Sequence, residues 1–132
     1  MDQLKVHYLG GMGFEVRARQ HALTIDLIKE KGGKDLGMNP PEVFMASLGS
    51  CIGVHVVRYC QNAELNAEGM SIALDWKISD DKTKISDINV HILLPGEKLG
   101  KREKALLEVA RHCLIHNTIL GQPQIHIALR ET

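Results

Sequence analysis

The first third of the chain is divided into short apolar segments by turn residues. Segments 4–9, 14–19 and 22–27 are separated by the dipeptides GG and QH. Strand-length segments with such short connections predict an antiparallel meander of three strands.

The pattern then changes to a helix start followed by a continuous apolar run. Asn39 can cap a helix, Pro40 suits the first helical position, and Glu42 can reach back to the cap from the third. Over residues 40–61 nearly every side of the predicted helix is apolar, which is typical of a buried helix. Such a helix would be about 30 Å long. Because a chain of 132 residues has little material to cover it, we expect a partner subunit to supply part of the cover.

Gly49 and Gly53 lie four residues apart on this helix and form a smooth stripe that another backbone can approach closely. We expect the stripe to face a partner subunit. Packing against the chain's own sheet is the alternative.

Two later segments alternate between apolar and polar residues with the period of a β-strand. They are residues 71–79 and 86–94, and the sequence DDKT between them suits a hairpin tip. The apolar positions that share one face are Ile72, Leu74, Trp76, Ile78, Ile88, Val90, Ile92 and Leu94.

The last part of the chain predicts one more helix and one more strand. Residues 101–117 carry apolar side chains at helical spacing, with charges on the other face and Asn117 as the C-terminal cap. After Gly121 and Pro123, residues 125–130 alternate as a final strand. The order βββ-α-ββ-α-β predicts an α+β fold in a single domain over residues 1–132.

Composition excludes several classes of function. Lys plus Arg and Asp plus Glu both number 16, without a long run of either sign, so there is no basic footprint for nucleic acid. The N-terminus does not resemble a signal peptide, and no segment approaches the roughly 20 apolar residues of a membrane span. We therefore expect a cytoplasmic protein without nucleic-acid or membrane partners.

Phosphate-binding glycine loops, a GxSxG elbow and a CxxC pair are absent from the sequence, so we expect no nucleotide and no cofactor.

The candidate chemistry lies in three cysteines, Cys51, Cys60 and Cys113. Cytoplasmic thiols are kept reduced, so these residues are interpreted as free, catalytic or metal-binding. Cys51 and Cys60 lie half a turn apart on their helix and cannot both face Cys113. Cys60 is therefore interpreted as a core residue, while Cys51 and Cys113 can meet if their helices pack on the same sheet. Simple core packing is the alternative for this pair also.

A reactive thiolate needs a positive or hydrogen-bonding environment. Arg17 and Arg19, expected on one face of the second strand, are the candidate activators, and Glu42 can hold an arginine in place. The pattern does not choose between the two arginines.

A zinc site is an alternative for these cysteines, because His55 follows Cys51 and His116 follows Cys113 at helical spacing. Two cysteines and two histidines can form a tetrahedral site. The separation of the two pairs does not match the usual finger spacing, so no metal is expected.

Two strings resemble the OsmC/Ohr family of osmotically induced and organic hydroperoxide resistance proteins. NPPEVFMASLGSCIGVHVV is similar to the family's Pro-x-Glu helix start, which is followed by a cysteine in a small-residue helix. RHCLIHNTILGQPQIHIAL resembles its second cysteine segment. The similarity runs in order from Asp26 to Leu129.

The resemblance implies an OsmC/Ohr-like fold and an intertwined homodimer, with the long helices at its centre and active sites at the subunit interface. It implies reduction of organic or fatty-acid hydroperoxides to alcohols. Cys51 would be the peroxidatic thiolate that becomes a sulfenic acid, and Cys113 the resolving thiol that forms a Cys51–Cys113 disulfide. Glu42 would orient a catalytic arginine, and an external lipoyl-type dithiol would reduce the disulfide.

The activating arginine is the point at which the sequence departs from the family. The family's peroxidases use an arginine from the N-terminal strands, and here VRARQ offers Arg19, which we prefer, or Arg17. If neither reaches Cys51, the alternative function is a dimeric protein of the same fold that binds a hydrophobic or acyl ligand, with weak or no peroxidase activity.

Overall fold

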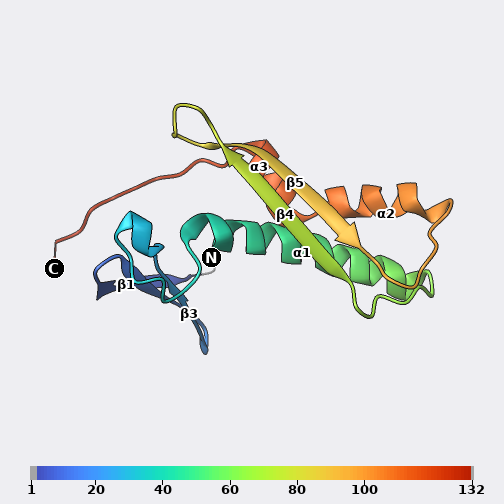
Figure 1. Cartoon of the computed structure of the whole chain (residues 1–132), viewed down its shortest axis with the longest axis horizontal. Coiled ribbons are helices and arrows are strands. Elements are labelled where there is room, and N and C mark those ends of the chain that lie inside the picture. Colours follow the sequence, from blue (N-terminus) through green and yellow to red (C-terminus); the bar gives the residue numbers. More distant parts are fainter. Residues whose placement is uncertain (1–2, 132) are drawn as a thin grey trace. The chain divides into compact units, whose positions relative to one another are not determined.

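The structure is a computed structural model of the chain, and it describes residues 3–131 (Figure 1). The chain forms two compact units, one ending at Ala46 and the other beginning at Ser47. The expectation that they function as a single domain stays a prediction.

The first unit contains the three-stranded antiparallel meander, as predicted. Strands β1 (Lys5–Gly10), β2 (Gly13–Ala18) and β3 (His21–Ile25) form a sheet in the order β1-β2-β3. Their register pairs Val6 with Val16.

A buried carboxylate organises the loop after β3, which contains the 3₁₀ helix η1 (Lys29–Lys31). Asp26 is only 2% exposed and accepts hydrogen bonds from the backbone N–H groups of Leu27 at 2.8 Å and of Lys34 and Leu36 at 3.2 Å. Burial works to raise the pKa of Asp26, but these three donors outweigh it and hold the pKa below its ordinary value. The loop therefore wraps around an ionised side chain.

The start of helix α1 (Pro40–Asn62) confirms the predicted capping box. The Asn39 N–H donates to Glu42 Oε1 at 2.9 Å, and the Glu42 N–H donates to Asn39 Oδ1 at 2.9 Å. The reciprocal bonds satisfy donors that a helix start leaves free.

In the second unit α1 is buried along one face, not on every side. The buried face repeats every four residues through Leu48, Ile52, Val56 and Cys60. Val54 is 49% exposed, so the second unit by itself leaves part of the helix uncovered. The expected cover from a partner subunit stays a prediction.

The glycine stripe packs against the chain's own sheet, and our preferred interpretation as a subunit contact is wrong. A Cβ at Gly49 would lie 2.8 Å from Leu74 Cδ1, and one at Gly53 would lie 3.2 Å from Ile72 Cδ1. The stripe is smooth because the β4 side chains occupy that space.

The predicted hairpin is formed by β4 (Ser71–Ile78) and β5 (Ile85–Leu93), which lies across α1 in Figure 1. Trp76 pairs with Ile88 in its register. Six of the eight alternating apolar residues pack on the buried cluster around Val56, as the period-two pattern predicts: Ile72, Leu74, Ile88, Val90, Ile92 and Leu94. Trp76 and Ile78 are outside that cluster, and Ile78 is 39% exposed.

The predicted helix over residues 101–117 is instead two helices. Helix α2 (Arg102–Arg111) ends before Cys113, and helix α3 (Leu114–Gly121) begins directly after it. Asn117, expected as a cap, lies inside α3. Apolar spacing continues through the break, so the pattern alone concealed it.

The expected final strand is not formed. Residues 122–130 follow α3 without pairing to any strand of the described chain, and Ile125, Ile127 and Leu129 are 78%, 94% and 94% exposed. A strand requires a neighbouring edge for its backbone groups, and none of the strand edges within residues 3–131 pairs with this segment.

Helix α1 has the length and composition of a membrane-spanning helix, contrary to the expectation that no segment approaches one. Core helices of soluble proteins pass the same test, and a single such helix is weak evidence for a membrane span.

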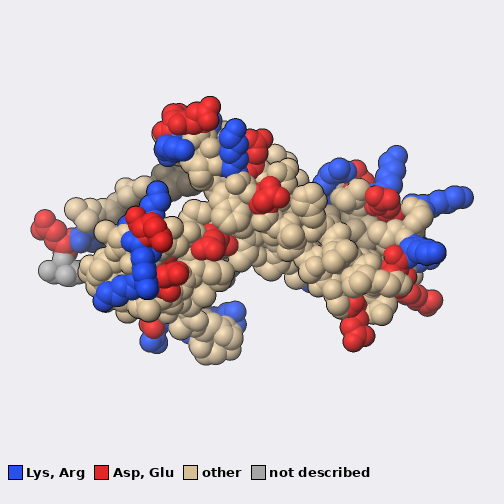
Figure 2. Space-filling view, in the orientation of Figure 1, with Lys and Arg blue, Asp and Glu red and all other residues tan. Residues whose placement is uncertain are grey.

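On the face shown in Figure 2, acidic and basic side chains lie interspersed and do not gather into one basic patch.

Candidate functional site

The second unit brings Cys51 and Cys113 close enough for each thiol to shift the pKa of the other, and Cys60 does not contribute to either shift. Cys51, on α1, is half-buried, whereas Cys113 and Cys60 are completely buried. Cys51 packs against the buried cluster that contains both Cys113 and Cys60. The inward orientation of Cys113 and the core position of Cys60 are confirmed.

Cys113 is the N-cap of α3. Its backbone is extended, with φ of −85° and ψ of 150°, and its Sγ accepts a hydrogen bond from the His116 N–H at 3.1 Å. The first turn of a helix carries free N–H groups and a partial positive charge. The cysteine pair therefore lies at a helix terminus that favours negative charge.

The same terminus acts on Cys51. The backbone N–H of Ile115 has the largest effect on the pKa of Cys51 and lowers it, while burial works to raise it. Hydrogen bonds from the Cys113 thiol and the Leu114 N–H lower it further, so the pKa of Cys51 lies below its ordinary value.

The other two thiols shift in the opposite direction. Burial raises the pKa of Cys113, and donation of its S–H to Cys51 raises it further, against the opposing bond from the His116 N–H. Burial and the charge of Glu97 raise the pKa of Cys60. Within this chain, Cys51 is therefore the thiol that ionises most readily.

Sequence reasoning missed these backbone donors because it placed Cys113 inside a helix. Cysteine is not among the residues that mark a helix start. The nearest signal for a helix break in the sequence is that the charged residues stop after Arg111. Several other kinds of sequence pattern produce the same change, so it does not identify a break.

The predicted activating side chains lie in the first unit. Arg17, on β2, is exposed and forms an ion pair with Glu15. Arg19 is not on the strand; it lies in the turn after β2, with a positive φ of 55°. Glu42 holds the N-terminus of α1 through Oε1. Their roles at Cys51 stay predictions.

An open cavity of about 420 Å³ lies beside the helices that carry the two cysteines. It is lined from α1, β5, α2 and α3 by Leu48, Ile52, Ile85, Ser86, Ile88, Val90, Ile92, Leu107, Ala110, Arg111, His116, Ile119 and Leu120. Almost all of these side chains are apolar, which suits an apolar ligand.

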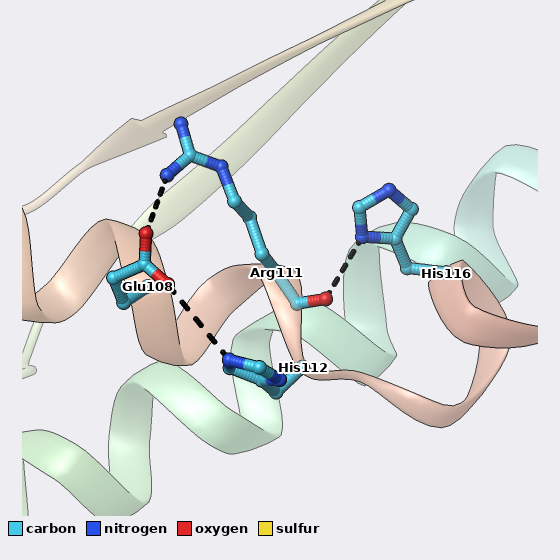
Figure 3. Close-up of polar contacts among 4 residues, drawn as sticks. All are labelled: Glu108, Arg111, His112 and His116. Atoms are coloured by element: carbon cyan, nitrogen blue, oxygen red, sulfur yellow. Dashed lines mark hydrogen bonds and ion pairs between the residues drawn. The ribbon is translucent and has the colours of Figure 1, made fainter. Parts of the chain in front are cut away.

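Polar contacts join α2 to α3 at one side of this cavity (Figure 3). Arg111 Nη1 donates to Glu108 Oε1 at 3.1 Å, and His112 Nε2 lies 3.8 Å from Glu108 Oε2. The His116 ring lies with Nδ1 3.0 Å from the Arg111 carbonyl oxygen. Arg111 is thereby fixed at the end of α2, next to the start of α3.

Replacing Leu114 by proline is expected to raise the pH at which Cys51 becomes reactive. Leu114 is the first residue of α3, where proline is tolerated, and the extended backbone of Cys113 suits the residue before a proline. The Leu114 side chain is 72% exposed, so the main loss is one N–H donor to Cys51. Iodoacetamide labelling of Cys51 across pH, resolved by peptide mass spectrometry, measures the change.

Leu114→Ala is the matched control, because it shortens the side chain and keeps the N–H. Equal labelling midpoints for the two variants would show that this donor does not stabilise the thiolate.

Comparison with known proteins agrees with this architecture. Residues 32–128 match the family profile described as OsmC-like protein, so the chain belongs to the OsmC-like family. No curated protein matches the sequence closely enough to count as a relative.

Solved structures share the fold at low sequence identity. An osmotic stress induced and detoxification response protein from Psychrobacter arcticus superposes with a TM-score of 0.81 at 20% identity, covering 89% of this chain and 88% of that one. An OsmC-like protein from Mycoplasma pneumoniae gives 0.76 at 16% identity, covering 92% and 89%. An organic hydroperoxide resistance protein from Legionella pneumophila gives 0.68 at 19% identity, covering 92% and 90%. The fold is therefore the OsmC-like α+β fold with a long central helix.

Proposed function

We propose that this protein is a thiol peroxidase that reduces organic hydroperoxides. The observation that carries the proposal is the pair of opposite pKa shifts: Cys51 is held toward the thiolate while Cys113 is held as the thiol. A peroxidatic and a resolving cysteine need this difference. Family membership and neighbours named organic hydroperoxide resistance proteins, from Legionella pneumophila and Vibrio cholerae, support it.

The reaction proceeds in three steps. The Cys51 thiolate attacks the terminal peroxide oxygen, the O–O bond breaks, and the alkoxide takes a proton to leave as the alcohol. Cys113 then attacks the Cys51 sulfenic acid, which forms the disulfide and releases water. An external dithiol of the lipoyl type exchanges with the disulfide, restores both thiols and becomes oxidised itself.

A homodimer is part of the proposal. Phe44 and Val54 on α1 are 41% and 49% exposed, and the apolar C-terminal segment has no partner among the described residues. Glu42 and Cys51 are nine residues apart on one helix, which places them on opposite faces. A Glu42–arginine pair would therefore act on Cys51 of the other copy. We place this dimer in the cytoplasm, where external dithiols keep thiols reduced.

The binding-protein alternative is favoured by one observation, the apolar cavity beside the cysteine helices. It predicts a hydrophobic ligand retained through purification, which native mass spectrometry detects. Finding only empty protein would count against it.

The test of the peroxidase proposal is turnover by the purified chain. We expect consumption of cumene hydroperoxide in the presence of dihydrolipoamide, and a Cys51–Cys113 disulfide after one equivalent of peroxide without reductant. Non-reducing peptide mapping identifies the disulfide, and light scattering on the same sample reports whether the species is a dimer. Absence of turnover with dihydrolipoamide and with a small dithiol would exclude the proposed activity.

A further inference from the structure

The break between α2 and α3 redirects backbone N–H groups that an uninterrupted helix would use internally. In a continuous α-helix each N–H donates to the carbonyl four residues earlier, so the Ile115 N–H would donate to the Arg111 carbonyl. Here the Ile115 N–H acts on Cys51 and has the largest effect on its pKa. The next N–H, that of His116, donates to Cys113 Sγ at 3.1 Å. The break therefore supplies the backbone donors of the cysteine pair.

Redirecting these donors leaves a carbonyl at the end of α2 without its helical partner. The last carbonyls of a helix have no donor within the helix and need a partner elsewhere. Among the backbone bonds of the described residues, none joins the Ile115 N–H to the Arg111 carbonyl. The half-buried ring of His116 instead places Nδ1 3.0 Å from that carbonyl oxygen (Figure 3). The His116 side chain thus takes the place of the donor that the break removed.

The His116 ring can only be the donor in this contact. A carbonyl oxygen accepts and does not donate, so Nδ1 carries a proton. A doubly protonated ring keeps the same N–H, so the bond can persist in either charge state of the ring.

We propose that His116 is a positioning residue for the thiol pair: its bond to the Arg111 carbonyl holds α2 and α3 apart, so that the first N–H groups of α3 stay free to face Cys51. Without the ring, the Arg111 carbonyl would compete for the Ile115 N–H and withdraw a donor from the cysteine pair. The inference rests on the proposed function in one respect, which is that Cys51 is the thiol whose ionisation drives the reaction.

The test compares two replacements of His116 in the full, reduced chain. His116→Phe keeps a ring and removes the donor, whereas the side-chain amide of His116→Asn can donate to the same carbonyl. Iodoacetamide labelling of Cys51 across pH, resolved by peptide mass spectrometry, gives the midpoint of ionisation. We expect His116→Phe to raise this midpoint by about one pH unit, because a hydrogen bond to a charged sulfur is weakened. His116→Asn is expected to restore most of the difference.

His112→Phe is the matched control. His112 is the C-cap of α2, its side chain is 72% exposed, and its Nε2 lies 3.8 Å from Glu108 Oε2. The control removes an imidazole from the same junction and leaves the bond to the Arg111 carbonyl in place, so its midpoint is expected to be unchanged. Thermal unfolding confirms that each variant is folded. If His116→Phe does not fold, His116→Leu removes the same donor with a side chain that lacks the ring.

Leu114→Pro provides an independent arm of the experiment. Proline has no N–H and disfavours helical backbone at the preceding Cys113, so it holds the break open by itself. The ring of His116 is then no longer needed to keep α2 and α3 apart. Adding His116→Phe to Leu114→Pro is therefore expected to shift the midpoint by less than about a third of a pH unit.

Three results would each overturn the proposal: an unchanged midpoint in His116→Phe, equal shifts in His116→Phe and His116→Asn, or the same shift with and without Leu114→Pro. The first would mean that the ring only packs, the second that its donor is not what matters, and the third that its effect does not pass through the break. Failure of the proposed function is a separate result, because labelling needs no turnover. The expected midpoints without peroxide consumption would refute only the peroxidase, and turnover with an unshifted midpoint in His116→Phe would refute only this inference.

Discussion

Cys51→Ser is expected to lower the rate of peroxide reduction by at least about a thousandfold. A serine hydroxyl does not ionise near neutral pH, so the donors of Leu114 and Ile115 would have no anion to stabilise. Initial rates with cumene hydroperoxide and excess dihydrolipoamide measure the loss.

Cys113→Ser is expected to behave differently. Serine is a favoured N-cap, so the start of α3 should survive the change. Cys51 would still consume one equivalent of peroxide and form a sulfenic acid that dimedone traps, while no Cys51–Cys113 disulfide forms.

Cys60→Ala serves as the control, because Cys60 is not among the groups that shift the pKa of Cys51 or Cys113, so its removal should leave turnover intact. Two results would reverse the roles assigned to the thiols: turnover by Cys51→Ser, or dimedone labelling of Cys113 in the wild-type chain.

Gly33→Ala is expected to destabilise the protein by about 3 kcal/mol or more. A Cβ at Gly33 would overlap the carbonyl carbon and oxygen of Leu27 and would lie 2.8 Å from Asp26 Oδ1. Backbone atoms cannot rotate away as a side chain does, so the loop itself has to move. That movement would break the bonds from the Lys34 and Leu36 N–H groups to Asp26.

Urea unfolding followed by circular dichroism measures this loss. Gly121→Ala is the matched control, because nothing lies within 4 Å of its added Cβ and Gly121 has helical backbone at the end of α3. It is expected to change the free energy of unfolding by at most about 1 kcal/mol. Similar urea midpoints for the two variants would mean that the loop accommodates the extra Cβ without loss of stability.

These two predictions concern different parts of the family's architecture. The thiol substitutions test the cysteine pair that the second unit brings together. The glycine substitution tests the loop that leads from β3 toward the start of α1 in the first unit. The thiol substitutions can therefore abolish turnover in a stable protein, and the glycine substitution can lower the stability of an active one. The two results are independent of each other.

The sequence by itself determined the local structure. Asn39 and Glu42 identified the start of α1 because a capping box is an interaction between residues three apart. Period-two alternation identified the β4–β5 hairpin, and helix phase separated Cys60 from Cys51. The family resemblance added the division of roles between Cys51 and Cys113, which no local pattern contains.

Only the tertiary structure decided which surfaces meet. The stripe of Gly49 and Gly53 packs on β4 because the hairpin that fills it comes about twenty residues later in the chain. The last strand is not formed, because an alternating segment forms a strand only where another edge accepts its backbone groups. The break at Cys113 places a helix terminus against two thiols, and that backbone environment, which residue types alone do not encode, makes Cys51 the more acidic thiol.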